Sequence, residues 1–118
     1  MKTLLVITLV ATVTAFSIEN KLTGRWETRP SSKGSVTGVV FKADNSFEGY
    51  VNKKPFVSGI YTFQDSILSF TDNGCDGKQG VYKILFFSNE DSLRFIPIND
   101  SCDGRREGMS RLILGRIK

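Results

Sequence analysis

Histidine is absent from this sequence of 118 residues, and cysteine occurs only twice. Without histidine the chain cannot form a Ser-His-Asp triad, a histidine general base or a histidine metal ligand. A zinc site typically takes four nitrogen or sulfur ligands, which two cysteines do not supply. There is also no glycine-rich phosphate-binding motif of the Rossmann or P-loop type. The sequence therefore predicts a protein that is not an enzyme and that holds no metal and no cofactor.

A strong excess of charge of one sign is also missing. The formal net charge is +4, and the basic pairs Lys53 with Lys54 and Arg105 with Arg106 lie far apart in the sequence. Nucleic-acid binding would need basic residues gathered on one face, with aromatic side chains between them. The scattered pattern is more typical of a mildly basic, solvated surface. We therefore expect no nucleic-acid partner.

The main apolar run covers residues 3–16 and is too short to cross a bilayer as a helix. Lys2 precedes the run, and Ala15 and Ser17 place small residues where a signal peptidase reads. We interpret residues 1–17 as a signal peptide and residues 18–118 as the folded domain. This predicts a secreted or periplasmic protein without a membrane span. A buried N-terminal strand is the alternative, but the polar residues that follow the run favour the signal peptide.

The rest of the chain alternates between polar and apolar residues, which is the period of a β-strand with one buried face. No window has a sustained period of 3.6, so helices should be minor. Turn residues separate short alternating segments, as is typical of an all-β barrel or sandwich. The predicted strands cover residues 22–28, 35–43, 46–51, 56–63, 66–71, 80–87, 92–97 and 109–117.

The connections between these strands alternate in length. Those after the second, fourth and sixth strands are tight turns, and the others are longer loops. One of the longer loops is 52–55, because Pro55 should not sit inside a paired strand. If neighbouring strands pair in sequence order, the tight turns lie at one end and the longer loops at the other. Closure of the sheet removes its exposed edges, so we expect an all-β, eight-stranded up-and-down antiparallel barrel.

The two cysteines lie in the loops after the fifth and seventh strands, within a Cys-Asp-Gly motif that occurs twice. An up-and-down barrel brings these loops to the same end, so we expect a disulfide between Cys75 and Cys102. Exported proteins keep such bonds because their compartments are oxidising. Two free thiols are the alternative.

Acidic residues flank both cysteines, at Asp72, Asp76, Asp100 and Asp103. The disulfide would bring them to one rim of the barrel, where carboxylate oxygens could hold calcium. Aspartate is also a common loop residue, and no EF-hand spacing is present. We therefore expect ordinary loop residues rather than a metal site.

The chain is rich in aromatic residues, with nine phenylalanines, three tyrosines and one tryptophan. An eight-stranded barrel is either filled by its own side chains or just wide enough for one small molecule. Strand alternation points several of the aromatic side chains inward, which predicts a non-enzymatic protein that binds a small hydrophobic molecule. The candidate ligand-binding residues are Trp26, Phe41, Tyr61, Tyr82, Phe86 and Phe95.

A packed core without a cavity is the alternative. In that case the barrel would be a scaffold for an inhibitor or interaction module. The disulfide-bridged loops, with Arg105 and Arg106, would then contact a protein partner. An enzyme would be favoured only if Tyr61 or Tyr82 were hydrogen-bonded to a buried carboxylate in an open cavity.

Residues 22–26, Leu-Thr-Gly-Arg-Trp, resemble the Gly-x-Trp motif that opens the first strand of the lipocalins and their calycin relatives. The hairpins at 41–47 and 59–68 look like those of small bacterial lipocalin-like domains. The chain departs from the family in two respects. It lacks the middle lipocalin motif and the helix that follows the barrel in most members.

The resemblance implies a lipocalin-like, secreted, ligand-binding barrel. It also implies that Trp26 packs across the closed end of the barrel beneath an arginine from the last strand. Arg116 is the better match to that arginine, and Arg111 is the alternative.

Overall fold

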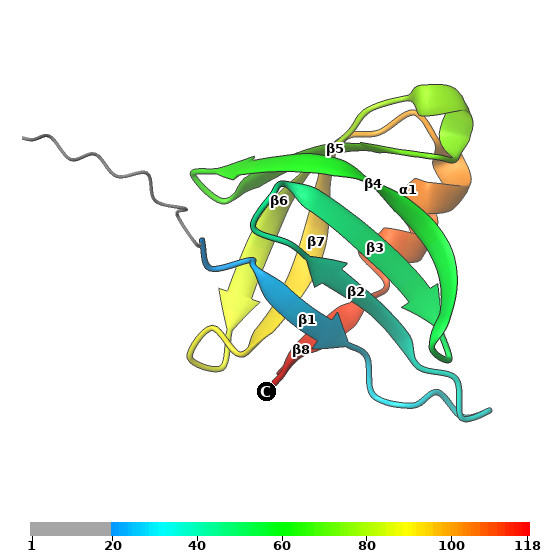
Figure 1. The fold of residues 1–118 in the computed structure, drawn as a ribbon, viewed down its shortest axis with the longest axis vertical. Coiled ribbons are helices and arrows are strands. Elements are labelled where there is room, and N and C mark those ends of the chain that lie inside the picture. Colours follow the sequence, from blue (N-terminus) through cyan, green and yellow to red (C-terminus); the bar gives the residue numbers. More distant parts are fainter. Residues whose placement is uncertain (1–19) are drawn as a thin grey trace, which may run out of the picture.

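The computed structural model describes residues 20–118 as a closed antiparallel barrel with one short α-helix (Figure 1). The strands follow one another around the barrel in sequence order, and β8 pairs back to β1. The prediction of an eight-stranded up-and-down barrel is confirmed. The elements are β1 (Gly24–Glu27), β2 (Thr37–Phe41), β3 (Ser46–Val51), β4 (Lys54–Gln64), β5 (Ile67–Asp72), the 3-10 turn η1 (Cys75–Gly77), β6 (Gly80–Phe87), β7 (Ser92–Asn99), α1 (Asp103–Ser110) and β8 (Ile113–Ile117).

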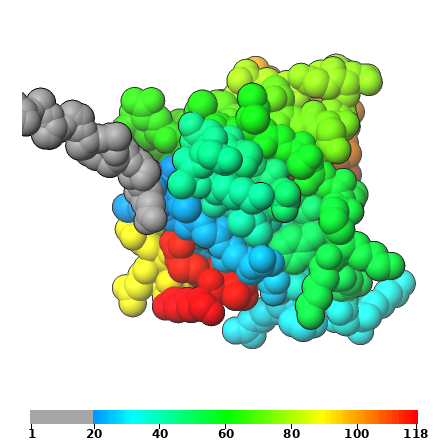
Figure 2. Space-filling view, viewed as in Figure 1, coloured from blue at the N-terminus to red at the C-terminus, as the bar shows by residue number. Residues whose placement is uncertain are grey.

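Pairing between the first and last strands closes the barrel. Trp26 on β1 lies opposite Val39 on β2 and opposite Arg116 on β8. In Figure 2 the C-terminal residues, coloured red, accordingly lie beside the blue β1. Alternation turns one face of each strand inward, which gathers the apolar core inside the barrel. The core residues are Leu22, Trp26, Phe41, Phe47, Tyr61, Leu68, Phe70, Tyr82, Ile84, Leu93, Phe95 and Leu114.

The connections lie at two opposite ends, as pairing of neighbouring strands in sequence order predicts. The β1–β2, β3–β4, β5–β6 and β7–β8 connections share one end, which we call the open end (right in Figure 1). The β2–β3, β4–β5 and β6–β7 turns share the other, which we call the closed end. At the open end Cys75 and Cys102 form the predicted disulfide, with their Cα atoms 5.9 Å apart.

The predicted loop at 52–55 is wrong, because the chain turns at residues 52 and 53 and β4 already begins at Lys54. Both turn residues have positive φ, of 52° and 70°, as in the tight turns that join antiparallel strands. Pro55 is paired with Tyr50 inside the sheet. The strand register shifts beside this pair, and proline is tolerated at such a bulge.

A second difference lies between Cys102 and the last strand. The sequence predicts a loop there and a strand from residue 109, but α1 covers Asp103–Ser110 and β8 begins only at Ile113. Gly104 and Gly108 lie inside the helix, and each glycine lowers helix propensity by about 1 kcal/mol relative to alanine. Local propensity therefore does not predict this helix. Its position depends on the disulfide before it and on the side-chain contacts described below.

The predicted signal peptide, residues 1–17, lies outside the described residues. The described chain begins with a turn, in which the Asn20 side-chain oxygen accepts hydrogen bonds from the backbone N–H groups of Leu22 and Thr23, at 2.8 and 3.0 Å. Within residues 20–118, no helix is long and apolar enough to span a membrane.

Candidate ligand-binding site

The closed end of the barrel is sealed by Trp26 and Arg116. The Trp26 side chain is fully buried, and its Nε1–H donates a hydrogen bond of 2.9 Å to the backbone oxygen of Leu22. The Arg116 guanidinium lies 4.2 Å from the centre of the indole ring. It also donates to the backbone oxygen of Lys21 at 2.8 Å. The arginine that packs on Trp26 is thus Arg116 rather than Arg111.

The barrel is hollow toward its open end. A cavity of about 670 Å³ lies between the barrel wall and α1. This is within the size range of pockets that bind small organic molecules, roughly 300–1,000 Å³. Its lining is predominantly apolar and includes Val39, Phe41, Phe47, Leu68, Phe70, Phe95 and Leu114, with Val51, Phe56, Val57, Met109 and Leu112 also contributing.

Aromatic side chains shape the inner wall of this cavity. The ring centres of Phe47 and Phe70 lie 5.6 Å apart, with their planes nearly perpendicular at 88°. Phe41 packs against Phe47 with a separation of 6.1 Å between ring centres. Edge-to-face and tilted ring contacts are favourable, so neighbouring rings hold one another in place. The wall is therefore formed before any ligand arrives, which lowers the conformational cost of binding.

The predicted ligand-binding residues fall into two groups. Phe41 and Phe95 line the cavity, and both come from strand positions that alternate inward. They remain in the candidate site. The predicted residues that lie outside the cavity lining are Trp26, Tyr61, Tyr82 and Phe86.

The residues outside the lining belong to the core beneath and beside the cavity. The rings of Trp26 and Phe86 lie 6.1 Å apart at the closed end. Tyr61 donates its hydroxyl hydrogen to the backbone oxygen of Lys42, in the β2–β3 turn, at 2.8 Å. An inward direction is therefore not sufficient to place a side chain in the cavity, because its depth along the barrel also matters.

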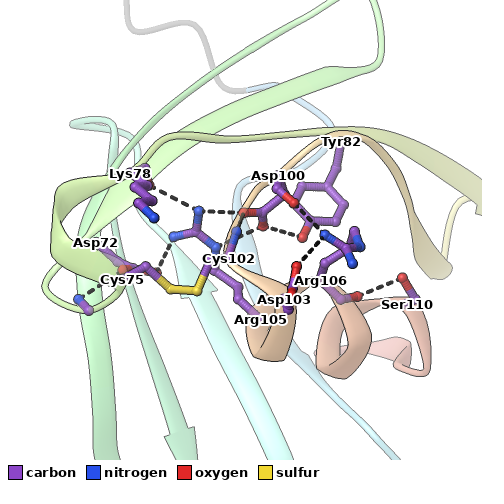
Figure 3. Close-up of polar contacts among 11 residues, drawn as sticks. Asp72, Cys75, Lys78, Tyr82, Asp100, Cys102, Asp103, Arg105, Arg106 and Ser110 are labelled. Atoms are coloured by element: carbon purple, nitrogen blue, oxygen red, sulfur yellow. Dashed lines mark hydrogen bonds and ion pairs between the residues drawn. A yellow bond between two sulfur atoms is a disulfide. The ribbon is translucent and has the colours of Figure 1, made fainter.

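Arg105 on α1 forms the polar centre of the open end (Figure 3). Its Nε–H and Nη2–H groups donate to the two carboxylate oxygens of Asp100, both at 2.8 Å. Nη1 donates to Asp72 at 3.3 Å, and Nη2 to the backbone oxygen of Lys78 at 3.0 Å. The guanidinium also lies over the Phe70 ring, 4.8 Å from its centre. This one side chain ties α1 to the ends of β5 and β7 and to the loop before β6.

These ionised groups are buried, since the side chains of Arg105 and Asp100 are 8% and 0% exposed. Burial alone would raise the pKa of Asp100, but hydrogen bonds from Arg105, Tyr82 and the Cys102 backbone N–H lower it to about 2. Burial, together with the hydrogen bond to Asp100, raises the pKa of Tyr82. Tyr82 is therefore a neutral donor at physiological pH, and Asp100 is an ionised acceptor.

Arg105 and Arg106 do not form a shared basic surface at the rim, because Arg105 is buried. Arg106 is 40% exposed, pairs with Asp103 at 3.0 Å and donates to the backbone oxygen of Asp100 at 2.7 Å. Asp72 and Asp100 do come together at this rim, as the disulfide predicts. Both of their carboxylates bind Arg105. Among residues 20–118, no group of three side chains is arranged to hold a metal ion.

Tyr82 is hydrogen-bonded to the buried carboxylate of Asp100 at 2.5 Å. This contact would favour an enzyme if it faced an open cavity. Neither residue lines the cavity, and the carboxylate already accepts from Arg105. The absence of enzymatic activity stays a prediction.

Several cavity residues are missing from the predicted set. Phe47, Leu68 and Phe70 line the cavity from inward strand positions, so the alternation that selected Phe41 could also have selected them. Met109 lies on α1, which the sequence pattern does not indicate. A cavity residue on this helix, such as Met109, can be identified only when the position of the helix relative to the strands is known.

No protein-family model matches this chain, and no curated protein sequence matches it either. Inferences about its function therefore rest on the barrel, the cavity and the contacts at the two ends.

Proposed function

We propose that this protein is a secreted, lipocalin-like barrel that carries a small hydrophobic molecule and is not an enzyme. The observation that carries the proposal is the apolar cavity of about 670 Å³ at the open end. An empty cavity weakens a fold, because the atoms that line it lose packing contacts. A cavity beside a well-packed closed end therefore favours a ligand as its occupant.

The chemistry of the lining indicates a ligand with an apolar body and few polar groups. Side chains such as Leu68, Phe95 and Leu114 offer no hydrogen-bonding atoms. A polar group placed against them would lose its hydrogen bonds to water. Thr37 and Asn73 also line the cavity and can accept or donate hydrogen bonds, so we expect a polar end of the ligand to lie near them.

Two further observations support the lipocalin-like and exported parts of the proposal. The contact between Arg116 and Trp26 is the one that the Gly-x-Trp resemblance implies. The bond between Cys75 and Cys102 is compatible with an oxidising compartment outside the cytoplasm. Secretion or transfer to the periplasm, after cleavage of residues 1–17, accounts for this bond.

The proposal can be tested with an environment-sensitive apolar fluorophore such as N-phenyl-1-naphthylamine. We expect its emission to rise on binding to the purified protein and a competing apolar ligand to displace it. Val39 lines the cavity, whereas Val40, the next residue on β2, does not. Val39→Phe should fill part of the space and weaken probe binding at least about tenfold, the loss of roughly 1.4 kcal/mol. Val40→Phe, the matched control, should bind as the unaltered protein does.

Trp26 fluorescence and thermal unfolding would show that both variants are folded. Equal probe affinity in the Val39→Phe and Val40→Phe variants would contradict binding in the cavity. The interaction module, acting through the disulfide-bridged loops on a protein partner, would then be the better hypothesis.

A further inference from the structure

The start of β4, just after the β3–β4 turn, carries an unusually exposed aromatic residue, Phe56. Gly49 is paired with Val57 and Tyr50 with Pro55, so Phe56 is the extra residue of the β-bulge and has no partner on β3. Such bulges redirect a side chain relative to the regular alternation of a strand. Phe56 is 72% exposed, yet it also lines the cavity. The bulge thus places an aromatic ring at the mouth of the cavity, in contact with solvent.

Phe56 belongs to an apolar lip around this mouth. Val51 precedes the turn, and Met109 and Leu112 lie at and just after the end of α1. All of them line the cavity, and all except Phe56 are only partly exposed. We call Val51, Phe56, Met109 and Leu112 the apolar lip. These four apolar side chains line the cavity, and one of them, Phe56, is also largely exposed to solvent.

Basic residues gather on the same side of the open end. Arg29 and Lys33 lie in the β1–β2 loop, and Lys53 and Lys54 in and beside the β3–β4 turn. All are exposed, and none forms an ion pair with another side chain of residues 20–118. Neither connection contains an acidic residue. This side therefore carries uncompensated positive charge.

The two basic connections lie side by side. The backbone N–H of Val36 donates to the Asn52 side-chain oxygen at 2.9 Å, and the backbone N–H of Asn52 donates to the Val36 oxygen at 2.8 Å. Figure 1 shows both segments together at the lower right. The opposite side of the mouth, around η1 and α1, differs because it also carries the acidic Asp76, Asp103 and Glu107. Positive charge and the exposed ring are thus concentrated on one side.

We infer that the open end docks on an anionic lipid surface through the β3–β4 turn. Phe56 enters the interfacial region of the bilayer, and Lys53 and Lys54 contact the lipid headgroups. Lysines near an anionic membrane attract it electrostatically, and aromatic rings favour the boundary between headgroups and acyl chains. Docking in this orientation holds the apolar lip against the lipid. An apolar ligand can then pass between the bilayer and the cavity without crossing water.

A lipid surface fits these residues better than a folded protein partner does. The apolar contact is a single exposed ring with a narrow lip, whereas stable protein interfaces need a much larger complementary area. The lysines are long, flexible and unpaired, which suits the diffuse charge of a membrane rather than a defined set of acceptors. The inference goes beyond carriage of a ligand, because docking does not require a filled cavity.

Sedimentation with lipid vesicles tests this inference. Purified protein with its disulfide intact is mixed with vesicles of phosphatidylcholine alone or of phosphatidylcholine with phosphatidylglycerol. We expect binding mainly to the anionic vesicles, and weaker binding as salt screens the charges. The double variant Lys53→Glu and Lys54→Glu should lower the affinity at least about tenfold. Phe56→Ser should lower it by a similar factor, since the inserted ring is lost.

Matched controls come from the outer wall of the same barrel. Ile60, also on β4, is 66% exposed but lies away from the cavity, so Ile60→Ser should change vesicle affinity less than twofold. Lys83 on β6 is an exposed lysine far from the turn, and Lys83→Glu should have a similarly small effect. The residues before the barrel are identical in every variant, so differences report on the substituted positions.

A Phe56→Trp variant gives a direct readout of insertion. Its added tryptophan should shift to shorter emission wavelengths with anionic vesicles and be quenched by brominated acyl chains, while Trp26 stays buried. Equal binding to both vesicle types, or equal losses in the Phe56→Ser and Ile60→Ser variants, would overturn the inference. Tight binding to soluble heparin with no binding to vesicles would also overturn it, in favour of a polyanionic partner. The fluorophore assay above contains no vesicles, so failure of docking and failure of ligand carriage are separate results.

Discussion

The two ends of this barrel use the same pair of groups, an arginine over an aromatic ring, with different results. At the closed end the Arg116 guanidinium lies 4.2 Å from the Trp26 ring centre, and at the open end that of Arg105 lies 4.8 Å from the Phe70 ring centre. At the closed end Leu22 and Trp26 are fully buried in the core. The open end encloses a cavity of about 670 Å³.

The difference lies in what else each arginine binds. Arg116 donates hydrogen bonds to backbone oxygens, such as that of Lys21, and its one acidic partner is the half-exposed Asp91, at 3.7 Å. Arg105 binds the side chains of Asp100 and Asp72, which come from separate parts of the chain. Arg116 therefore covers a core that is already packed. Arg105 instead holds α1 in place over a space that side chains do not fill.

The sharpest test of this comparison is the Arg105→Met variant, for which we expect the largest decrease in the free energy of unfolding. The variant leaves the carboxylates of Asp100 and Asp72 buried without a counter-charge, which typically costs about 3–5 kcal/mol. Urea unfolding of the disulfide-intact protein should show a decrease of that size in the free energy of unfolding. Arg106→Met is the matched control, because it loses only an exposed ion pair and one hydrogen bond to a backbone oxygen, together worth about 1–2 kcal/mol. Equal decreases in the two variants would contradict the anchoring role of Arg105.

We expect low pH to decrease the free energy of unfolding by an intermediate amount. The pKa of Asp100 in the folded protein, about 2, lies below the value of about 3.9 in an unfolded chain. Ionised Asp100 therefore stabilises the fold above about pH 4, and this contribution of about 2–3 kcal/mol is lost as the pH falls from about 4 toward 2. Urea unfolding across this range measures the loss.

Other carboxylates also titrate in this range, so a variant is needed to isolate Asp100. Tyr82→Phe removes one hydrogen bond that lowers the pKa of Asp100. The pKa of Asp100 in the folded variant should rise, and the acid-dependent loss of stability should shrink. An unchanged pH dependence would show that the hydrogen bond from Tyr82 does not contribute to the lowered pKa of Asp100.

The smallest effect is expected at the closed end, for Arg116→Met. This variant loses a cation–π contact, hydrogen bonds to backbone oxygens and a partly exposed ion pair with Asp91, together worth about 1–2 kcal/mol. The side chain is 24% exposed, so water can replace part of what is lost. Arg111→Met is the control, because Arg111 is exposed and does not contact the indole. Trp26 emission should change in the Arg116 variant alone, and an equal change in both would contradict the assignment.

Much of the fold could be predicted because strand alternation and turn residues are local signals. β3 and β6 have the predicted bounds, and the barrel closes as the pattern of short and long connections indicates. Pro55 misleads because a proline usually marks a loop, whereas a bulge accommodates it here. The sequence does not predict the helix α1, because its two glycines lower the helix propensity of this segment.

The candidate site could be predicted only in part. Phe41 and Phe95 are correctly placed in the interior and line the cavity, but Tyr82, at an equally inward position, is used to bind Asp100. Alternation gives the direction of a side chain and not its depth or its partner. The burial of Arg105 also could not be predicted, because it depends on Asp72, on the Lys78 backbone oxygen and on the Phe70 ring, which are distant from it along the chain.

The sequence by itself determined the all-β class, the order of the strands and the pairing of the cysteines, since these follow from local periodicity and from which connections share an end. Only the tertiary structure decided that a cavity lies at the open end. That outcome depends on where α1 comes to lie, and α1 is positioned by the Cys75–Cys102 disulfide and by the ion pair of Arg105 with Asp72, which both join residues far apart in the chain. Long-range contacts of this kind leave no periodic trace in the sequence.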